Sequence, residues 1–72
     1  MRYRIGVTFR EFSGDYFAIS GSDGWIYVEE PGDATMWEHW NHADQAMRRM
    51  AIPADSVAWV EPVTDRDGVK GS

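Results

Sequence analysis

The first ten residues alternate apolar and polar side chains without a break. The apolar positions of this segment are Met1, Tyr3, Ile5, Val7 and Phe9. A period of two places successive side chains on opposite faces of an extended chain, so the segment predicts a half-buried β-strand. Its polar face carries Arg2, Arg4 and Arg10 and no acid, whereas all twelve acidic side chains lie after residue 10. The sequence therefore predicts a cationic strand within an acidic protein.

A chain of 72 residues allows one hydrophobic core, close to the lower size limit for independent stability. The chain has no cysteine, which excludes a disulfide and a four-cysteine zinc site. Burial must therefore come from its four Trp, three Tyr and three Phe side chains, or from homodimerisation. We expect a single compact domain over residues 1–63 and a flexible C-terminal tail over residues 64–72.

The composition also limits where the protein works and what it binds. No run approaches the roughly 20 apolar residues of a membrane span, and the alternating N-terminal segment does not read as a signal peptide. We therefore expect a cytoplasmic protein with no membrane partner. The formal net charge of −5 disfavours nonspecific binding to nucleic acid or anionic lipid and suits a protein that binds a basic partner.

Two turn clusters predict a three-stranded antiparallel meander. The residues Ser-Gly-Asp at 13–15 separate the first strand from an apolar run at 16–20. A stronger turn, Gly-Ser-Asp-Gly at 21–24, separates that run from a third strand that begins at Trp25. Pairing Ser20 with Trp25 across this second turn groups four apolar residues on one face. These residues are Phe17, Ile19, Ile26 and Val28.

The turn between the first and second strands allows two registers. A two-residue loop would bring the arginines of the first strand beside Phe17 and Ile19. A three-residue loop, with Gly14 in the left-handed position of a bulge, instead sets Phe9 opposite Ile19. We adopt the three-residue loop because it collects the apolar residues of all three strands on one inner face. That face comprises Ile5, Val7, Phe9, Phe17, Ile19, Ile26 and Val28.

A helix is expected after the sheet segment. Pro31 ends the third strand, and Thr-Met-Trp-Glu at 35–38 fits a capping box, so the helix should begin between Asp33 and Thr35. Pro53 should end it, because the residue before a proline resists helical geometry. The apolar residues at helical spacing are Met36, His39, Trp40, Ala43, Ala46, Met47 and Met50.

The residues Val-Ala-Trp-Val-Glu at 57–61 predict a fourth strand. A crossover through one helix normally gives a parallel, right-handed connection. We therefore predict the α/β (α+β) class: a two-layer βββαβ domain with one helix packed on one face of an antiparallel three-stranded meander. The fourth strand is expected to lie beside strand 1 and parallel to it, in the order 3-2-1-4. The alternative places it next to strand 3.

The sequence offers little for catalysis or metal binding. His39 and His42 have a spacing that can hold a metal, but a zinc site needs further ligands and no other His or Cys is present. The turn at 21–24 lacks the lysine of a phosphate-binding loop and precedes a strand. No nucleophile-elbow sequence surrounds any serine. We expect a protein that is not an enzyme and uses no cofactor and no metal.

The predicted strand order resembles the first part of a ribonuclease H-type sheet. That active site uses acids on the first strand, on the helix and at the end of the fourth strand. Glu38 and Glu61 could match the last two positions, but the first strand offers Thr8 and Arg10 instead of an acid. Two-metal nuclease chemistry is therefore not expected.

The same layout resembles that of the HicB antitoxins, small proteins that block a toxin ribonuclease. The resemblance rests on Met-Arg-Tyr at 1–3 with Gly-Asp-Tyr at 14–16, and on Gly-Asp-Ala-Thr at 32–35 before an alanine-bearing helix. The family's Leu-Pro-Gly segment is replaced by the turn at 21–24, and its DNA-binding extension is not matched. The resemblance is one of layout, without a claim of membership, and implies an inhibitor.

The predicted sheet has one helix, so its outer face is uncovered. In the adopted registers this face interleaves arginines with Tyr and Trp, which could bind a protein, stack bases, or pack against one another in solvent. We favour a small, acidic, non-catalytic protein-binding module that inhibits a basic, nucleic-acid-binding partner, such as an antitoxin-like protein of a phage or other mobile element. The alternative is a single-stranded nucleic-acid-binding module that uses the Arg/Tyr/Trp face.

The predicted interface combines this face with acidic positions in the loops and helix. Trp37 is included because it falls outside the helical stripe, and its alternative role is to fold over the sheet edge. The predicted interface residues are Arg2, Arg4, Arg10, Tyr16, Trp25, Tyr27, Glu29, Glu30, Asp33, Trp37, Glu38 and Asp44.

Overall fold

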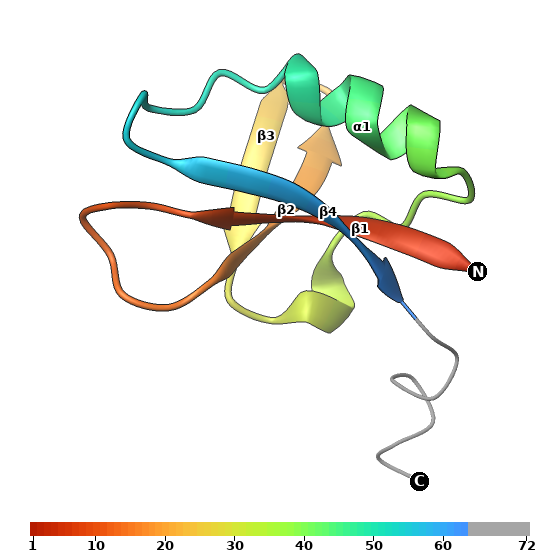
Figure 1. Cartoon of the computed structure of the whole chain (residues 1–72), viewed down its shortest axis with the longest axis horizontal. Coiled ribbons are helices and arrows are strands. Elements are labelled where there is room, and N and C mark those ends of the chain that lie inside the picture. The colour runs from red at the N-terminus through yellow and green to blue at the C-terminus, as the bar shows by residue number, and fades with distance from the viewer. Residues whose placement is uncertain (64–72) are drawn as a thin grey trace, which may run out of the picture.

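The computed structural model describes residues 1–63 and shows a four-stranded sheet with one α-helix on one side (Figure 1). The strands are β1 (Arg2–Thr8), β2 (Tyr16–Gly21), β3 (Gly24–Val28) and β4 (Val57–Val63), and the helices are the short 3-10 helix η1 (Pro31–Asp33) and α1 (Trp40–Arg48). The predicted C-terminal tail, residues 64–72, lies outside the described residues.

The sheet has the predicted order, β3-β2-β1-β4, and the α+β class is confirmed. Neighbouring strands are antiparallel throughout, so the prediction that the fourth strand runs parallel to the first is wrong. The pairing of β4 with β1 extends from Arg2 opposite Val63 to Thr8 opposite Val57.

A short bridging segment, residues 35–37, explains the direction of β4. Tyr3 and Trp37 exchange two backbone hydrogen bonds of 2.7 Å, which pair the segment with β1. The segment is also bonded to β2, because the Thr35 N–H donates to the Ala18 carbonyl oxygen at 3.1 Å and the Ser20 N–H donates to Thr35 Oγ1 at 2.8 Å. The bridging segment therefore bonds to both β1 and β2, which pair directly at only two positions.

The bridging segment and β4 both run antiparallel to β1, so they are parallel to each other, and the chain joins them through α1. The preference for parallel strands across a helical crossover is therefore obeyed. The crossover starts at the bridging segment, however, and not at β3. Three residues are too few to show a strand period in the sequence.

α1 begins later than the predicted capping box. The Thr35 hydroxyl accepts the Ser20 N–H rather than an N–H of the helix, and Trp37 lies in a β-bridge. The helix instead begins at Trp40, with His39 as an N-cap residue whose side chain makes no capping hydrogen bond. The predicted capping box is wrong because the Thr35 hydroxyl is hydrogen-bonded to the Ser20 N–H of β2 and does not cap the helix.

The predicted apolar stripe of the helix is confirmed for its C-terminal part. The members that are buried or packed against the core are Ala43, Ala46, Met47 and Met50. His39 is exposed and Trp40 is 51% exposed, so both lie outside the packed surface. The helix ends at Arg48, ahead of Pro53, which is consistent with the predicted stop.

The second hairpin is confirmed, with Ser20 opposite Trp25 and Ile19 opposite Ile26. The three-residue loop of the first hairpin is wrong. β1 and β2 pair with Gly6 opposite Phe17, and residues 9–15 form a longer connection. This register reverses the predicted faces of β2 and β3 relative to β1.

Aromatic packing explains the longer connection. The Phe9 ring lies 5.7 Å and the Phe12 ring 6.1 Å from the Tyr16 ring, measured between centroids in edge-on geometry. Phe9 also lies 5.1 Å from the Tyr27 ring. Gly14 adopts the expected left-handed conformation, with φ of 89°, but within this wider loop. The connection thus adds the Phe9 ring to the core instead of closing a tight turn, while Phe12 is 56% exposed.

The hydrophobic core lies between the sheet and α1. Its buried residues are Ile5, Val7, Ala18, Ala43 and Met50, and the partly buried Trp25 and Tyr27 pack against them. The two rings of β3 therefore occupy the place that the sequence assigned to Ile26 and Val28. Large rings bury more apolar area beside the small Ala18 and Ala43 than aliphatic side chains do, which favours the observed register.

Candidate functional site

The structure separates the residues that the sequence grouped into one Arg/Tyr/Trp face. Trp25 and Tyr27 face α1 and pack against the core, and burial raises the pKa of the Tyr27 hydroxyl above its ordinary value of 10.0. Arg2 and Arg4 lie on the opposite side of the sheet. The predicted alternation of arginines and aromatic rings on one surface is therefore wrong, because the first hairpin has the other register.

Several predicted interface residues have partners elsewhere in the fold. Arg10 forms an exposed ion pair with Asp55 at 3.2 Å. Asp44 accepts a hydrogen bond from Arg48, one turn further along α1, at 2.9 Å. Tyr16 belongs to the ring cluster of the β1–β2 loop. The predicted acids Glu29, Glu30, Asp33 and Glu38 are exposed.

Trp37 is held in place by its backbone bonds to Tyr3, and its indole packs against the core. The alternative expectation was a ring folded over the sheet edge, whereas Trp37 lies beside β1, an inner strand, with its ring against the core. Its Nε1 is buried and has no hydrogen-bond partner among the described residues.

The side of the sheet opposite α1, which we call the outer face, is mostly apolar. It consists of Arg2, Arg4, Gly6 and Thr8 of β1, Phe17 and Ile19 of β2, Ile26 and Val28 of β3, and Val57, Trp59, Glu61 and Val63 of β4. Sequence reasoning placed the apolar residues of β2 and β3 inside and assigned no role to those of β4. The two-residue loop considered for the first hairpin would have indicated this face, because it sets the arginines of β1 beside Phe17 and Ile19.

Gly6 makes the outer face continuous across β1. It lies opposite Phe17 on one side and opposite Trp59 on the other. The Trp59 indole lies so close to Gly6 that a Cβ at this position would overlap the ring. Because glycine has no side chain, the indole can lie over β1, and on the β2 side of Gly6 the Phe17 side chain is 8% exposed.

A hydrogen-bonded ion pair orders the centre of the outer face. Arg4 Nε and one terminal guanidinium nitrogen each lie 2.6 Å from Glu61 Oε2. Trp59 Nε1 donates to Glu61 Oε1, also at 2.6 Å. The Arg4 guanidinium carbon lies 5.2 Å from the centroid of the Phe17 ring, within the range of a cation–π contact. Four side chains from three strands are thereby fixed relative to one another.

The strands at the two ends of the sheet expose large apolar side chains of the outer face. Ile26 on β3 is 57% exposed and Val57 on β4 is 63% exposed. Between them Ile19 and Trp59 are half-buried. An apolar surface of this kind with polar neighbours is typical of interaction sites.

Negative charge is concentrated where the chain leaves β3. Glu29, Glu30 and Asp33 follow this strand and are exposed. None of the three forms an ion pair with another of the described residues. The end of β3 therefore carries an unneutralised acidic cluster next to the apolar outer face.

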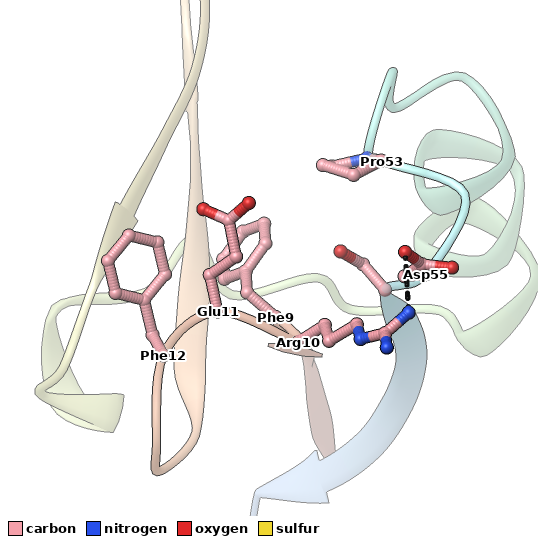
Figure 2. A pocket seen from close by; sticks show the side chains of 7 residues that line it. Phe9, Arg10, Glu11, Phe12, Pro53 and Asp55 are labelled. Atoms are coloured by element: carbon pink, nitrogen blue, oxygen red, sulfur yellow. Dashed lines mark hydrogen bonds and ion pairs between the residues drawn. The ribbon is translucent and has the colours of Figure 1, made fainter.

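A small pocket lies between the β1–β2 loop and the segment that precedes β4 (Figure 2). Its volume is about 130 Å³, and Phe9, Phe12 and Pro53 line it together with the Arg10–Asp55 ion pair. Cavities of roughly 150 Å³ hold a benzene-sized group. Glu11 and Ser56 complete the lining, so the pocket has room for one apolar group beside polar side chains.

The two histidines of the chain lie close together just before and at the start of α1. The exposed rings of His39 and His42 meet edge-on with centroids 5.1 Å apart. Within residues 1–63, no three His, Asp or Glu side chains are grouped so that they could hold a metal ion. Over the same residues, no helix has the length and apolar character needed to cross a membrane.

The ribonuclease H-type layout is not formed, because β4 is antiparallel to β1. Glu61 is bonded to Arg4 and Trp59, and Glu38 is exposed ahead of α1. Comparison of the chain with protein-family models, with curated proteins and with solved structures found no match.

Proposed function

We propose that this protein is a small, non-catalytic module that binds a basic protein through the outer face and acts by covering a surface of that partner. The observation that carries the proposal is the exposure of Ile26 and Val57, 57% and 63%, at opposite ends of one apolar sheet face. Burial of such side chains against a partner removes apolar surface from water, which is the main favourable term in protein association.

The centre of the outer face has the composition of an interface centre. Trp and Arg are enriched among the residues that contribute most to protein binding. Trp59 and Arg4 are both held by Glu61 before any partner arrives. Side chains that are already ordered lose less conformational entropy on binding, so this arrangement favours affinity.

The charge of the chain favours a basic partner. The formal net charge is −5, and the acidic cluster of Glu29, Glu30 and Asp33 lies beside the outer face. Complementary charge accelerates association and disfavours acidic proteins. Nucleic-acid-binding proteins present basic surfaces, so an inhibitor of such a protein, encoded by a phage or another mobile element, is the class of function that we propose.

Direct binding of single-stranded nucleic acid is less favoured. The aromatic rings that would stack bases, Trp25 and Tyr27, pack against the core, and Arg4 is neutralised by Glu61. Arg2 is then the one arginine of the outer face that has no ion pair within residues 1–63.

The proposal is tested by affinity capture from extracts of the native host, followed by calorimetry with the captured protein. The variant Ile26→Ser with Val57→Ser should bind at least about tenfold more weakly, because two exposed apolar contacts are lost. The matched control is Trp40→Ser, which removes a side chain of similar exposure, 51%, from α1.

The proposal would be contradicted if Ile26→Ser with Val57→Ser bound the partner as tightly as the wild type. It would also be contradicted if only Trp40→Ser bound more weakly. A parallel titration with labelled single-stranded oligonucleotides addresses the other function. Micromolar binding that weakens steeply with salt would favour nucleic acid over a protein partner.

A further inference from the structure

β3 lies at one end of the sheet, and the bonds of the bridging segment establish which of its backbone groups are free. Ala18 and Ser20 direct their backbone groups to Thr35, away from β3. Bonding directions alternate along an antiparallel strand. The residues of β2 that bond to β3 are therefore Phe17, Ile19 and Gly21, and their partners are Val28, Ile26 and Gly24.

The same alternation directs the N–H and C=O groups of Trp25 and Tyr27 away from β2, along the open edge of the sheet. Neither residue takes part in a further hydrogen bond with the described part of the chain. Their side chains nevertheless pack against the core, so the backbone of this edge is held in strand geometry. Two free donors and two free acceptors are thus aligned for a further strand.

The opposite edge of the sheet, on β4, contains a proline. Tyr3 bonds to Trp37, so the even residues of β1 face β4 and the even residues of β4 face outward. Pro62 is one of these outward residues and supplies no N–H. β3 contains neither proline nor lysine, the residues that commonly protect an edge strand from pairing.

Acidic side chains flank the open edge. Asp23 precedes β3, and Glu29 and Glu30 follow it, all three exposed. A second copy of the chain, paired antiparallel through β3, would bring these acids against one another. A basic segment would meet opposite charges at both ends.

We propose that β3 binds an extended, basic segment of the partner protein as a fifth strand, hydrogen-bonded to the backbones of Trp25 and Tyr27. The inference rests on the proposed function and adds to it the binding mode, strand addition at a sheet edge. Affinity would come from backbone bonds, and selectivity from the flanking acids and from the exposed Ile26.

The test uses chemically synthesised protein in which the Tyr27 nitrogen is methylated, which removes one outward N–H and retains the side chain. The matched control carries N-methyl Val60, an outward residue of β4. The probe is a fluorescent peptide of alternating arginine and valine, with a glutamate–valine peptide for comparison. Binding is measured by anisotropy, and circular dichroism reports folding.

The expected result is that the arginine–valine peptide binds the unmodified protein and the Val60 control equally, and binds N-methyl Tyr27 about tenfold more weakly. The glutamate–valine peptide should not bind. The inference is overturned if the arginine–valine peptide does not bind, if N-methyl Tyr27 binds it fully, or if N-methylation at Tyr27 unfolds the protein, because the N–H would then be used inside the fold. If strand addition fails in this assay but Ile26→Ser with Val57→Ser still loses capture of the partner protein, the proposed function is retained and only the binding mode is rejected.

Discussion

Gly6 is the residue on which the continuity of the outer face depends. A Cβ at this position would overlap the Trp59 ring, and displacing the ring would also break its hydrogen bond to Glu61. We expect Gly6→Ala to lower the free energy of unfolding by about 1–3 kcal/mol, the usual cost of overpacking. Urea denaturation measures this change.

Gly32→Ala provides the matched control, because a Cβ at Gly32 meets no atom within 4 Å. Its free energy of unfolding should change by less than about 0.5 kcal/mol. A Gly6→Ala variant as stable as the Gly32→Ala control would show that the Trp59 ring does not rest on β1.

Tyr27 should make the protein less stable in alkali. Burial raises the pKa of its hydroxyl in the folded state above the ordinary value of 10.0. Below that value the hydroxyl is neutral in both states, whereas at higher pH the unfolded chain releases its proton first. The free energy of unfolding should therefore fall as the pH rises through about 10 towards the folded-state pKa.

Denaturation of the wild type and of Tyr27→Phe between about pH 9 and about pH 11 measures this contribution. The difference in stability between the two proteins should shift in favour of Tyr27→Phe as the pH rises. A difference that is independent of pH would contradict the assignment of the buried hydroxyl.

At the scale of elements, the bridging segment, residues 35–37, holds β1 and β2 together. Thr35 Oγ1 accepts the Ser20 N–H at 2.8 Å. Thr35→Val keeps the shape of the side chain and removes this acceptor, so we expect a loss of about 0.5–1.5 kcal/mol of stability. Hydrogen exchange at the Ser20 amide should accelerate in Thr35→Val and remain slow in Thr35→Ser. Unchanged exchange in Thr35→Val would show that the hydroxyl does not bond to β2.

The N-terminus of α1 has no side-chain cap, so a capping residue should stabilise it. His39 is the N-cap residue with extended φ and ψ of −125° and 134°, but its side chain makes no capping bond, and the first turn contains no acid. His39→Asp should raise the free energy of unfolding by about 0.5–1 kcal/mol, because the carboxylate can accept a free N–H and complements the helix dipole. Thermal denaturation compares this variant with His39→Ala, which should show no gain. Equal stability of the two variants would mean that capping does not limit α1.

At the scale of the whole molecule, charge opposes self-association through the outer face. The sequence has a pI of about 4.7, so repulsion between copies disappears as the pH falls towards that value. We expect self-association to increase near this pH, and the variant Ile26→Ser with Val57→Ser to remain monomeric. Sedimentation equilibrium at neutral and acidic pH measures both. Equal association of the wild type and the variant would place the contact on another surface.

Several features were predictable because they depend on local pattern. The alternation of residues 1–10 predicted β1, and the turn at 21–24 predicted the hairpin of β2 and β3. The helical spacing from Ala43 to Met50 predicted a helix that is present but begins later than expected. The candidate site was predicted less well. Four of its five predicted acids are exposed, and the fifth, Asp44, is partly buried and paired with Arg48. Trp25 and Tyr27 were assigned to the wrong face, because the length of one loop determines the parity of both later strands.

The sequence by itself determined the four strands, the presence of one α-helix and the acidic character of the chain, since these follow from side-chain periodicity, turn residues and charge count. The strand order came from the preferred geometry of a helical crossover, and the structure confirms that order. The tertiary structure alone decided the direction of β4, the face that Phe17 and Ile26 occupy, and the use of Arg4 as a partner of Glu61. Each of these depends on contacts between residues distant in the chain. The Thr35 hydroxyl bonded to Ser20 and the Phe9 ring packed on Tyr27 are such contacts, and no local pattern reveals them.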